Sequence, residues 1–402
     1  MCGSTSEGRN KSPAGRFSYR LAVVSILLSI LTGMFLQGCV SMTNTDGLVL
    51  RYEKDGEISG IPDARLPGDQ VPAQLERFAP PDGSGSGDYL AISGGGANGA
   101  YGAGVLVGWS EHGDRPVFRI VTGVSTGALI APFAFLGSEY DAALQELYTT
   151  TGERDILGWK PPLSVVFSGS IFDSQALESR IRSIVDSEIV HRIAEEHLSG
   201  RRLLIGTTDL GTGKPVVWNI GAIAASSIDE AVKRDLVVSI LLASASIPGV
   251  FPPVVIPVAR GTEQSTEVHV DGGVSSQVFL YPPALDFRRV VLSAVSPAVP
   301  RVYIIQNAGT KPVPKTVLLR FGSIVSRSID ILTTYQGIGD LYRIYTATQR
   351  DGIAFFLASI PEDAVLESAI DFDPKNMEQL FRTGYLAARS GYPWARTPPG
   401  YR

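Results

Sequence analysis

The chain has 402 residues, of which 44% are hydrophobic and 19% charged, and this is enough apolar material for one large globular domain or two smaller ones. Its net charge of −5 gives no sign of the clustered lysines and arginines of a nucleic-acid-binding protein. With two cysteines and four histidines, the sequence excludes a disulfide scaffold and a zinc site in the mature chain, and we expect no metal and no other cofactor.

The N-terminus has the pattern of a secretory signal. Basic residues precede the apolar run Leu21–Phe35, which is too short to span a membrane comfortably. The next residues, "LQGC" (Leu36–Cys39), resemble a bacterial lipobox, with Gln37 where Ala or Ser is more usual. The resemblance implies that residues 1–38 are a lipoprotein signal peptide and that Cys39 becomes the lipidated first residue. An uncleaved anchor with an incidental cysteine is the alternative.

Residues 39–87 are expected to form a lipidated tether, because Pro, Gly, Asp and Ser accumulate there and the stretch ends in "PPDGSGSG". Val40 follows the cysteine, where an Asp would favour retention in the inner membrane by enterobacterial-type sorting. The lipobox resemblance therefore implies an anchored protein of the bacterial cell envelope. If the source has two membranes, the expected place is the outer membrane, facing the periplasm.

The stretch "YLAISGGGANGAYGAGVLVGW" predicts a strand at 88–93, a glycine loop and a helix at 98–111. Its spacing G-x-G-x-x-G matches the fingerprint of dinucleotide-binding proteins. A second strand is expected at 117–123, and it ends without the acidic residue that would bind the ribose. No Lys-Ser or Lys-Thr follows the glycines, so a P-loop is excluded as well.

The second strand runs into "GVSTG" (Gly123–Gly127), which has the pattern of a nucleophile elbow with Ser125 at its apex. A helix expected at 126–137 begins directly after the serine, and its dipole favours negative charge there. Parallel strands would bring this turn and the glycine loop to one edge of the sheet. The N–H groups of Gly94–Gly96, with that of Thr126, would then hold a tetrahedral oxyanion rather than a pyrophosphate. An ordinary tight turn is the alternative.

A Gly- and Pro-rich segment, Thr150–Asp173, is either a lid or interfacial patch near the serine or an ordinary long connection. Beyond it, the pattern predicts a helical section at 174–198, strands at 203–208 and 216–219, and a helix at 228–245.

The partner of the serine is expected in "EVHVDGGVSSQ". Alternation of Val268 and Val270 predicts a strand that ends at Asp271, with a turn at Gly272–Gly273. No histidine follows Asp271, so the order Ser, acid, His of an α/β-hydrolase triad is absent. An Asx turn without a catalytic role is the alternative for this aspartate.

Taken together, "GGGANG", "GVSTG" and "DGG" occur in the order that is typical of patatin-like phospholipases, and the chain resembles that family. "LIGTTDLGTGKPVVW" and "SILLASASIPGVFPPV" resemble two further family segments. The resemblance implies a catalytic dyad of Ser125 and Asp271. It also implies an oxyanion hole that is formed by Gly94, Gly95, Gly96 and Thr126. The remaining motif glycines are Gly99, Gly123, Gly127, Gly272 and Gly273. Desolvation in a cleft raises the pKa of a carboxyl group, so Asp271 should act directly on Ser125 from hydrogen-bond distance.

One position departs from the family pattern. The family loop usually carries Arg or Lys where this chain has Asn98, and the departure bears on substrate preference more than on activity.

In the C-terminal third, strands are expected at 301–309 and 353–360 and helices near 317–350 and 375–390. The whole pattern predicts an α/β fold, a three-layer α/β/α sandwich with a mostly parallel central sheet, in one catalytic domain at 88–402. The expected function is hydrolysis of membrane lipids or acyl esters through an acyl-serine, with no nucleic-acid partner and an open oligomeric state. A catalytically silent lipid-binding lipoprotein and an acyltransferase that uses the same acyl-serine are the alternatives.

Overall fold

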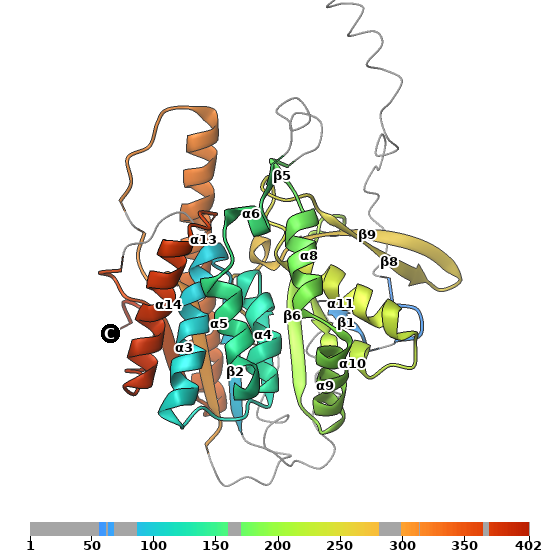
Figure 1. The fold of residues 1–402 in the computed structure, drawn as a ribbon, viewed down its shortest axis with the longest axis horizontal. Helices are drawn as coiled ribbons and strands as arrows, with labels where there is room; N and C mark the ends of the chain where they lie inside the picture. Colours follow the sequence, from blue (N-terminus) through green and yellow to red (C-terminus); the bar gives the residue numbers. More distant parts are fainter. Residues whose placement is uncertain are drawn as a thin grey trace, which may run out of the picture. The chain divides into compact units, whose positions relative to one another are not determined.

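The computed structural model describes residues 56–61, 63–67, 87–159, 170–280, 299–312, 314–364 and 370–401 (Figure 1). Its strands are β1 (Arg65–Pro67), β2 (Asp88–Ile92), β3 (Ile120–Val124), β4 (Gly158–Trp159), β5 (Phe172–Asp173), β6 (Arg202–Asp209), β7 (Lys214–Asn219), β8 (Val254–Arg260), β9 (Glu263–Asp271), β10 (Arg301–Gly309) and β11 (Ala354–Ile360). Its α-helices are α3 (Gly99–His112), α4 (Thr126–Leu136), α5 (Asp141–Thr149), α6 (Glu153–Ile156), α8 (Gln175–Ile184), α9 (Ser187–Leu198), α10 (Ile220–Ala224), α11 (Glu230–Ser244), α13 (Phe321–Asp351) and α14 (Pro374–Arg389).

The central sheet has a parallel core and an antiparallel flank. In the described residues its order is β1-β7-β6-β3-β2-β10-β11, and the neighbours from β6 to β11 run parallel. On the other side β7 and β1 are antiparallel, and β6 also pairs with β9 of the β8–β9 hairpin. Strand β2 is the point where the order reverses, because the chain passes from it to β3 on one side and later returns to β10 on the other.

Helices cover both faces of the sheet. Along β2, Leu90 and Ile92 belong to one apolar cluster, while Tyr89 and Ala91 belong to a second. The first cluster is completed by α3, α4, α11 and α14, several of which stand side by side in front of the sheet in Figure 1. The second is completed by residues 341–347 of α13. Because strand side chains alternate between faces, this pattern gives three layers. The expected three-layer α/β sandwich with a mostly parallel sheet is confirmed.

The antiparallel flank is the part of the sheet that the sequence predicted least well. Strand β8 was not expected at all, and it lies at an edge where it pairs with β9. Pro257 in its middle has no N–H to donate, which weakens a strand prediction but is tolerated on an edge strand. The expected helical section at 174–198 is two helices, α8 and α9, which are separated by Val185 and Asp186.

The folded unit begins earlier than residue 88. Residues 56–61 and 63–67, which the sequence analysis assigned to the tether, are part of the folded unit Tyr52–Arg402. Strand β1 adds to the sheet beside β7, and Ile58, Ile61 and Leu66 are buried in its cores. The expected tether therefore ends, at its C-terminal side, within the folded unit. The predicted signal peptide and Cys39 lie outside the described residues, and no described helix has the length and apolar character needed to cross a membrane.

Candidate active site

The glycine loop and the serine turn meet at the carboxyl ends of neighbouring parallel strands. Residues Gly94–Gly96 follow β2, and Ser125 follows β3, which pairs with β2 in parallel register. The end of β10, on the other side of β2, borders the same loop, because a Cβ on Gly95 would collide with the carbonyl oxygen of Asn307. This is the reversal point of the strand order, where open α/β sheets commonly bind their ligands.

Ser125 is held in a strained backbone conformation. It has φ 55° and ψ −125°, and it is the one non-glycine residue with positive φ in the described part of the chain. The turn is tight enough that Cβ atoms at two motif glycines would collide with backbone, Gly123 with Gly127 and Gly127 with Ile92. Strain of this kind costs about 1–3 kcal/mol and is concentrated at functional sites. The side chain is 6% exposed and lines an apolar pocket.

Asp271 lies at the end of β9 and is buried beside the serine. Its Oδ1 accepts a hydrogen bond of 2.7 Å from the N–H of Gly273, while its Oδ2 is buried without a hydrogen-bond partner within normal geometric limits among the described residues. Burial raises the pKa of Asp271 to about 7, although the nearby Ser125 hydroxyl and the Gly273 N–H lower it. The structure thus brings together the two residues that the sequence paired.

The backbone N–H groups of the glycine loop differ in availability. That of Gly94 donates to the carbonyl of Gln277 at 2.9 Å, so it is not free for a substrate oxyanion, contrary to its expected role. No hydrogen bond is formed by the N–H groups of Gly95 and Gly96 in the described residues, and Gly96 lines the same pocket as Ser125 and Thr126. Thr126 is the first residue of α4, whose first-turn N–H groups have no partner within the helix.

The other motif glycines allow these loops to lie close together. A Cβ on Gly99 would collide with the side chain of Thr126, so the glycine loop rests directly on the start of α4. On the acid side, a Cβ on Gly272 would collide with the carbonyl oxygen of Gly206 in β6. Gly273 donates the hydrogen bond to Asp271 that was described above.

Ser244 is a site residue that the sequence analysis did not single out. Its hydroxyl donates to the carbonyl of Gly206 at 2.7 Å and accepts the N–H of Ser125 at 3.0 Å, so it ties the elbow to β6. It is fully buried at the end of α11. The only signal in the sequence was its place in the Ser/Ala-rich stretch that resembled the family.

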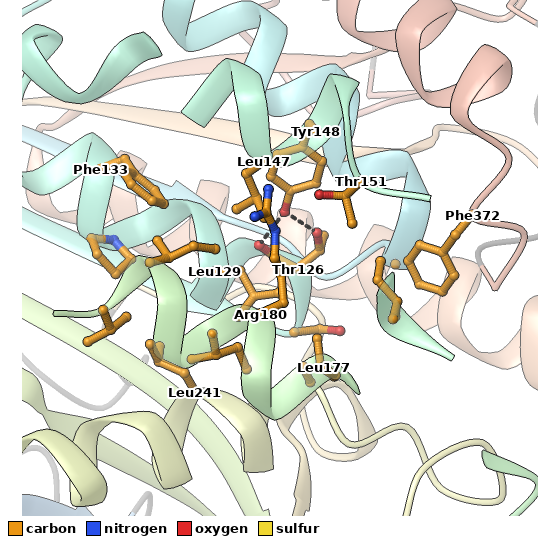
Figure 2. A pocket seen from close by; sticks show the side chains of 18 of the residues that line it. Thr126, Leu129, Phe133, Leu147, Tyr148, Thr151, Leu177, Arg180, Leu241 and Phe372 are labelled. Carbon is orange, nitrogen blue, oxygen red and sulfur yellow. Dashed lines mark hydrogen bonds between the residues drawn. The ribbon is translucent and has the colours of Figure 1, made fainter. Parts of the chain in front are cut away.

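The pocket beside Ser125 is lined mostly by apolar side chains. Figure 2 shows its lining, in which Leu129, Phe133, Leu147 and Leu177 project inward from three different helices. Its empty space measures about 830 Å³, including the open mouth. Polar groups in the lining are few; the Thr126 hydroxyl is bonded to that of Tyr148 at 2.5 Å. The pocket is suited to an aliphatic chain.

The segment that was expected to be either a lid or a plain connection contributes to this pocket. Thr151 and Ile156 line it, and Ile156 belongs to the short helix α6. Residues 160–169 lie outside the described residues.

None of the four histidines lines the pocket. His269, the nearest in sequence to Asp271, is fully buried and uses both ring nitrogens, one toward Thr207 and one toward Glu267. His112 and His191 lie on the surface, near Asp114 and Glu195 respectively, and His197 lies in α9 against Gly221. Within the described ranges, no three His, Cys, Asp or Glu side chains come together as metal ligands would.

Comparison with known proteins agrees with the motifs. A family model described as patatin-like phospholipase matches residues 90–283, which contain the glycine loop, the elbow and the Asp271 turn. Among solved structures, the crystal structure of VipD from Legionella pneumophila aligns with a TM-score of 0.34 at 10% identity, over 87% of this chain and 71% of that chain. No curated protein matches the chain in sequence. The match implies lipid hydrolase activity, and residues 90–283 of the chain belong to the patatin-like phospholipase family.

Proposed function

We propose that the protein is a serine lipid acyl hydrolase in which Ser125 is the nucleophile and Asp271 is the general base. The observation that carries the proposal is the buried Asp271 carboxyl group, with a pKa of about 7, beside a strained serine that lines an apolar pocket. A general base is most effective when its pKa is near the working pH. No histidine is needed, because the carboxylate itself has the required basicity.

In the first half of the reaction, the acyl chain lies in the apolar pocket and its ester carbonyl lies at Ser125. The Oγ proton passes to Asp271 while Oγ bonds to the carbonyl carbon. The resulting oxyanion is stabilised by N–H groups of Gly95, Gly96 and Thr126, and each such donor contributes about 2.7–4 kcal/mol in hydrolases. Collapse breaks the bond to the alcohol, which leaves with the proton from Asp271, and an acyl-serine remains.

In the second half, a water molecule gives its proton to Asp271 and attacks the acyl carbonyl. The same N–H groups hold the second oxyanion, and its collapse releases the fatty acid and returns the proton to Ser125. The acyl-serine is common to hydrolases and acyltransferases. Product analysis in water, with and without added alcohols, would therefore identify whether water or an alcohol accepts the acyl group.

The test is one variant with a matched control. Ser125→Ala should abolish both hydrolysis of a chromogenic acyl ester and labelling by a fluorophosphonate, because both need the Oγ nucleophile. Ser199→Ala removes an exposed hydroxyl that donates to the carbonyl of Glu196 at the end of α9, and it should leave both unchanged. Persisting hydrolysis by folded Ser125→Ala protein would remove this serine from the mechanism.

We also propose that the mature chain starts at a lipidated Cys39 and acts at a membrane of the cell envelope. Cys39→Ser should leave an unprocessed precursor that takes up no clickable fatty acid. Normal processing and acylation of that variant would contradict the assignment.

A further inference from the structure

A second, polar pocket adjoins the catalytic loop on the side away from the acyl pocket. Gly94, Gly95 and Asn98 form one wall of it, whereas Gly96 and Ser125 line the acyl pocket. The glycine loop is therefore the partition between an apolar and a polar cavity. The empty space of the polar pocket is about 700 Å³, including its open side.

The far wall comes from the part of the chain beyond the family match. Lys311 and Lys315 lie between β10 and α13, and Arg327 and Asp330 lie on α13. Three cations thus face one carboxylate, in a protein whose net charge is −5. Lys311 also contacts Glu362 at 2.7 Å, but both side chains are more than half exposed, so this pair holds the ammonium group only weakly.

Two amide side chains in this pocket have unused hydrogen-bonding capacity. Gln306, which is only 4% exposed, has an Oε1 with no partner among the described residues. Leaving such a group unsatisfied costs about 1–3 kcal/mol. Asn98 is half-buried and makes no side-chain hydrogen bond in the described part of the chain. Asn307, which follows Gln306 in the sequence, is by contrast hydrogen-bonded through both polar atoms of its side chain.

We propose that this polar pocket binds the phosphate of a glycerophospholipid head group while the acyl chain occupies the apolar pocket. The ester then lies over Ser125, between the two. Lys311 and Lys315 supply charge-assisted hydrogen bonds to the phosphate oxygens. Positive charge that the family usually carries at position 98 is provided here by residues 311–327. The inference rests on the proposed acyl hydrolase function.

The test compares two esters with the same acyl chains, dioctanoyl phosphatidylglycerol and dioctanoylglycerol, in the same neutral detergent micelles. The full-length protein should prefer the phosphate-bearing ester. Lys311→Gln/Lys315→Gln should lower the ratio of the two kcat/KM values about tenfold or more, which corresponds to about 1.4 kcal/mol, and leave hydrolysis of dioctanoylglycerol within about twofold. The control Lys375→Gln/Arg382→Gln removes two exposed cations of α14 and should change neither.

An unchanged ratio in the Lys311/Lys315 variant would overturn the head-group assignment while leaving the acyl hydrolase intact. Failure of the proposed function looks different, because neither ester would then be cleaved, or Ser125→Ala would still cleave them. Competition experiments distinguish a lipid head group from free phosphate as the ligand of the polar pocket. Stronger inhibition by sn-glycerol 3-phosphate than by inorganic phosphate supports the lipid head group, and the reverse order assigns the pocket to free phosphate and overturns the proposal.

A separate observation concerns the outer face of α13. The first half of this helix projects beyond the other labelled helices in Figure 1. Several of the large apolar side chains that are exposed in the described residues lie on it or just before it: Leu318, Leu319, Ile324, Val325, Ile329, Ile331, Leu332 and Tyr335. At about 100° per residue, those on the helix span an arc of about 160°, opposite the side that carries Arg327, Asp330, Thr333 and Thr334 toward the polar pocket.

The charge around this apolar face indicates what covers it. Residues 311–335 contain four cations (Lys311, Lys315, Arg320 and Arg327) and one acidic residue, Asp330. Apolar side chains flanked by lysine and arginine are typical of elements that lie in the interface of an anionic bilayer, where each cation contributes about 1 kcal/mol. We infer that the first half of α13 docks on an anionic phospholipid membrane and brings the polar pocket to the head groups.

Docking is tested by comparing vesicle and monomeric substrates. Leu319→Asp/Leu332→Asp should lower the rate on phosphatidylglycerol vesicles about tenfold or more relative to the rate on a monomeric short-chain phospholipid. Val117→Asp/Leu198→Asp changes two equally exposed apolar residues elsewhere and should leave this ratio unchanged. A ratio that Leu319→Asp/Leu332→Asp does not alter would overturn the docking. So would conversion of a dimer to a monomer by that variant without a kinetic effect, because a second copy would then cover the face.

Discussion

The pKa of Asp271 sets the pH range in which the proposed dyad works. Burial raises this pKa to about 7, and only the deprotonated carboxylate accepts the serine proton. We therefore expect kcat/KM to rise about tenfold per pH unit below pH 7 and to level off above it. Pre-steady-state acylation measured from pH 5 to 9 checks this, and a rate that stays constant down to pH 5 would contradict a base whose pKa is raised by burial.

The same burial makes Asp271 a cost to the folded state. Between its ordinary value of 3.8 and about 7, the folded protein binds more protons at this site than the unfolded chain does. The free energy of unfolding therefore falls as pH rises through this window. Asp271→Asn keeps the acceptor for the Gly273 N–H. It should abolish hydrolysis and yet raise the free energy of unfolding at pH 8, by up to about 4 kcal/mol. Urea unfolding at pH 8 and pH 5 is the measurement, and equal stability of both proteins at pH 8 would refute the argument.

Ser244 is expected to act as a positioning residue for the nucleophile. Ser244→Ala removes the acceptor of the Ser125 N–H, which helps to hold the strained turn. We expect a loss of kcat of about 10- to 100-fold, which corresponds to about 1.4–2.7 kcal/mol, with little change in KM. Ser246→Ala is the control, since Ser246 is equally buried but its hydroxyl donates to the carbonyl of Leu242 in α11 and not to the elbow. If both variants lose the same activity, Ser244 has only a structural role.

These residues also show how much of the site can be predicted from local sequence. The serine and its flanking glycines were predictable, because the elbow is made by five consecutive residues. The hydrogen bond between Ser125 and Ser244 joins positions that are 119 residues apart. No sequence pattern near either residue predicts it. Gly94 has the same local pattern as Gly95, and only the position of Gln277 in three dimensions reveals that its N–H is occupied.

At the level of elements, the contact between α3 and α14 supports the glycine loop. A Cβ on Gly104 would collide with the carbonyl oxygen of Phe381, and one on Gly384 with that of Tyr101, so the two helices touch through their backbones. The loop leads directly into α3. The sequence predicted a tightly packed helix here from its small residues, but not the partner, which lies in the C-terminal third of the chain.

We predict that Gly→Ala substitutions at two helical glycines, one inside this contact and one outside it, change the stability of the protein in opposite directions. Gly104→Ala should destabilise the protein by about 1–3 kcal/mol, because the added methyl group has no room against α14. Gly339→Ala, in α13, adds a methyl group in open space and should stabilise by about 0.5–1 kcal/mol through helix propensity. Thermal unfolding of both variants checks the pair, and stabilisation by Gly104→Ala would show that the helices are not in backbone contact.

On the scale of the whole molecule, a buried ion pair joins the N-terminal segment to the antiparallel flank. Arg65 is paired with Glu267, which also accepts the N–H of Gly56 at 3.0 Å and contacts His269. Burial alone would raise the pKa of Glu267, but the hydrogen bonds from His269 and Arg65, together with the charge of Arg65, hold it at about 2. Composition alone assigned this segment to a tether, because a three-residue strand and one arginine do not stand out among prolines and glycines.

The ion pair predicts where the folded unit begins. A chain that starts at residue 56 keeps Arg65, whereas one that starts at residue 87 leaves Glu267 buried without its cation. Breaking a buried pair costs about 3–5 kcal/mol, so the shorter chain, like Arg65→Met in the longer one, should unfold at correspondingly lower urea. The contribution of a depressed carboxyl pKa is complete above the ordinary value of 4.5 and is lost as pH falls toward 2. The difference between the longer chain and its Arg65→Met variant should therefore shrink between pH 5 and pH 3, and a difference that persists undiminished at pH 3 would show that the arginine acts through packing and not through the charge of Glu267.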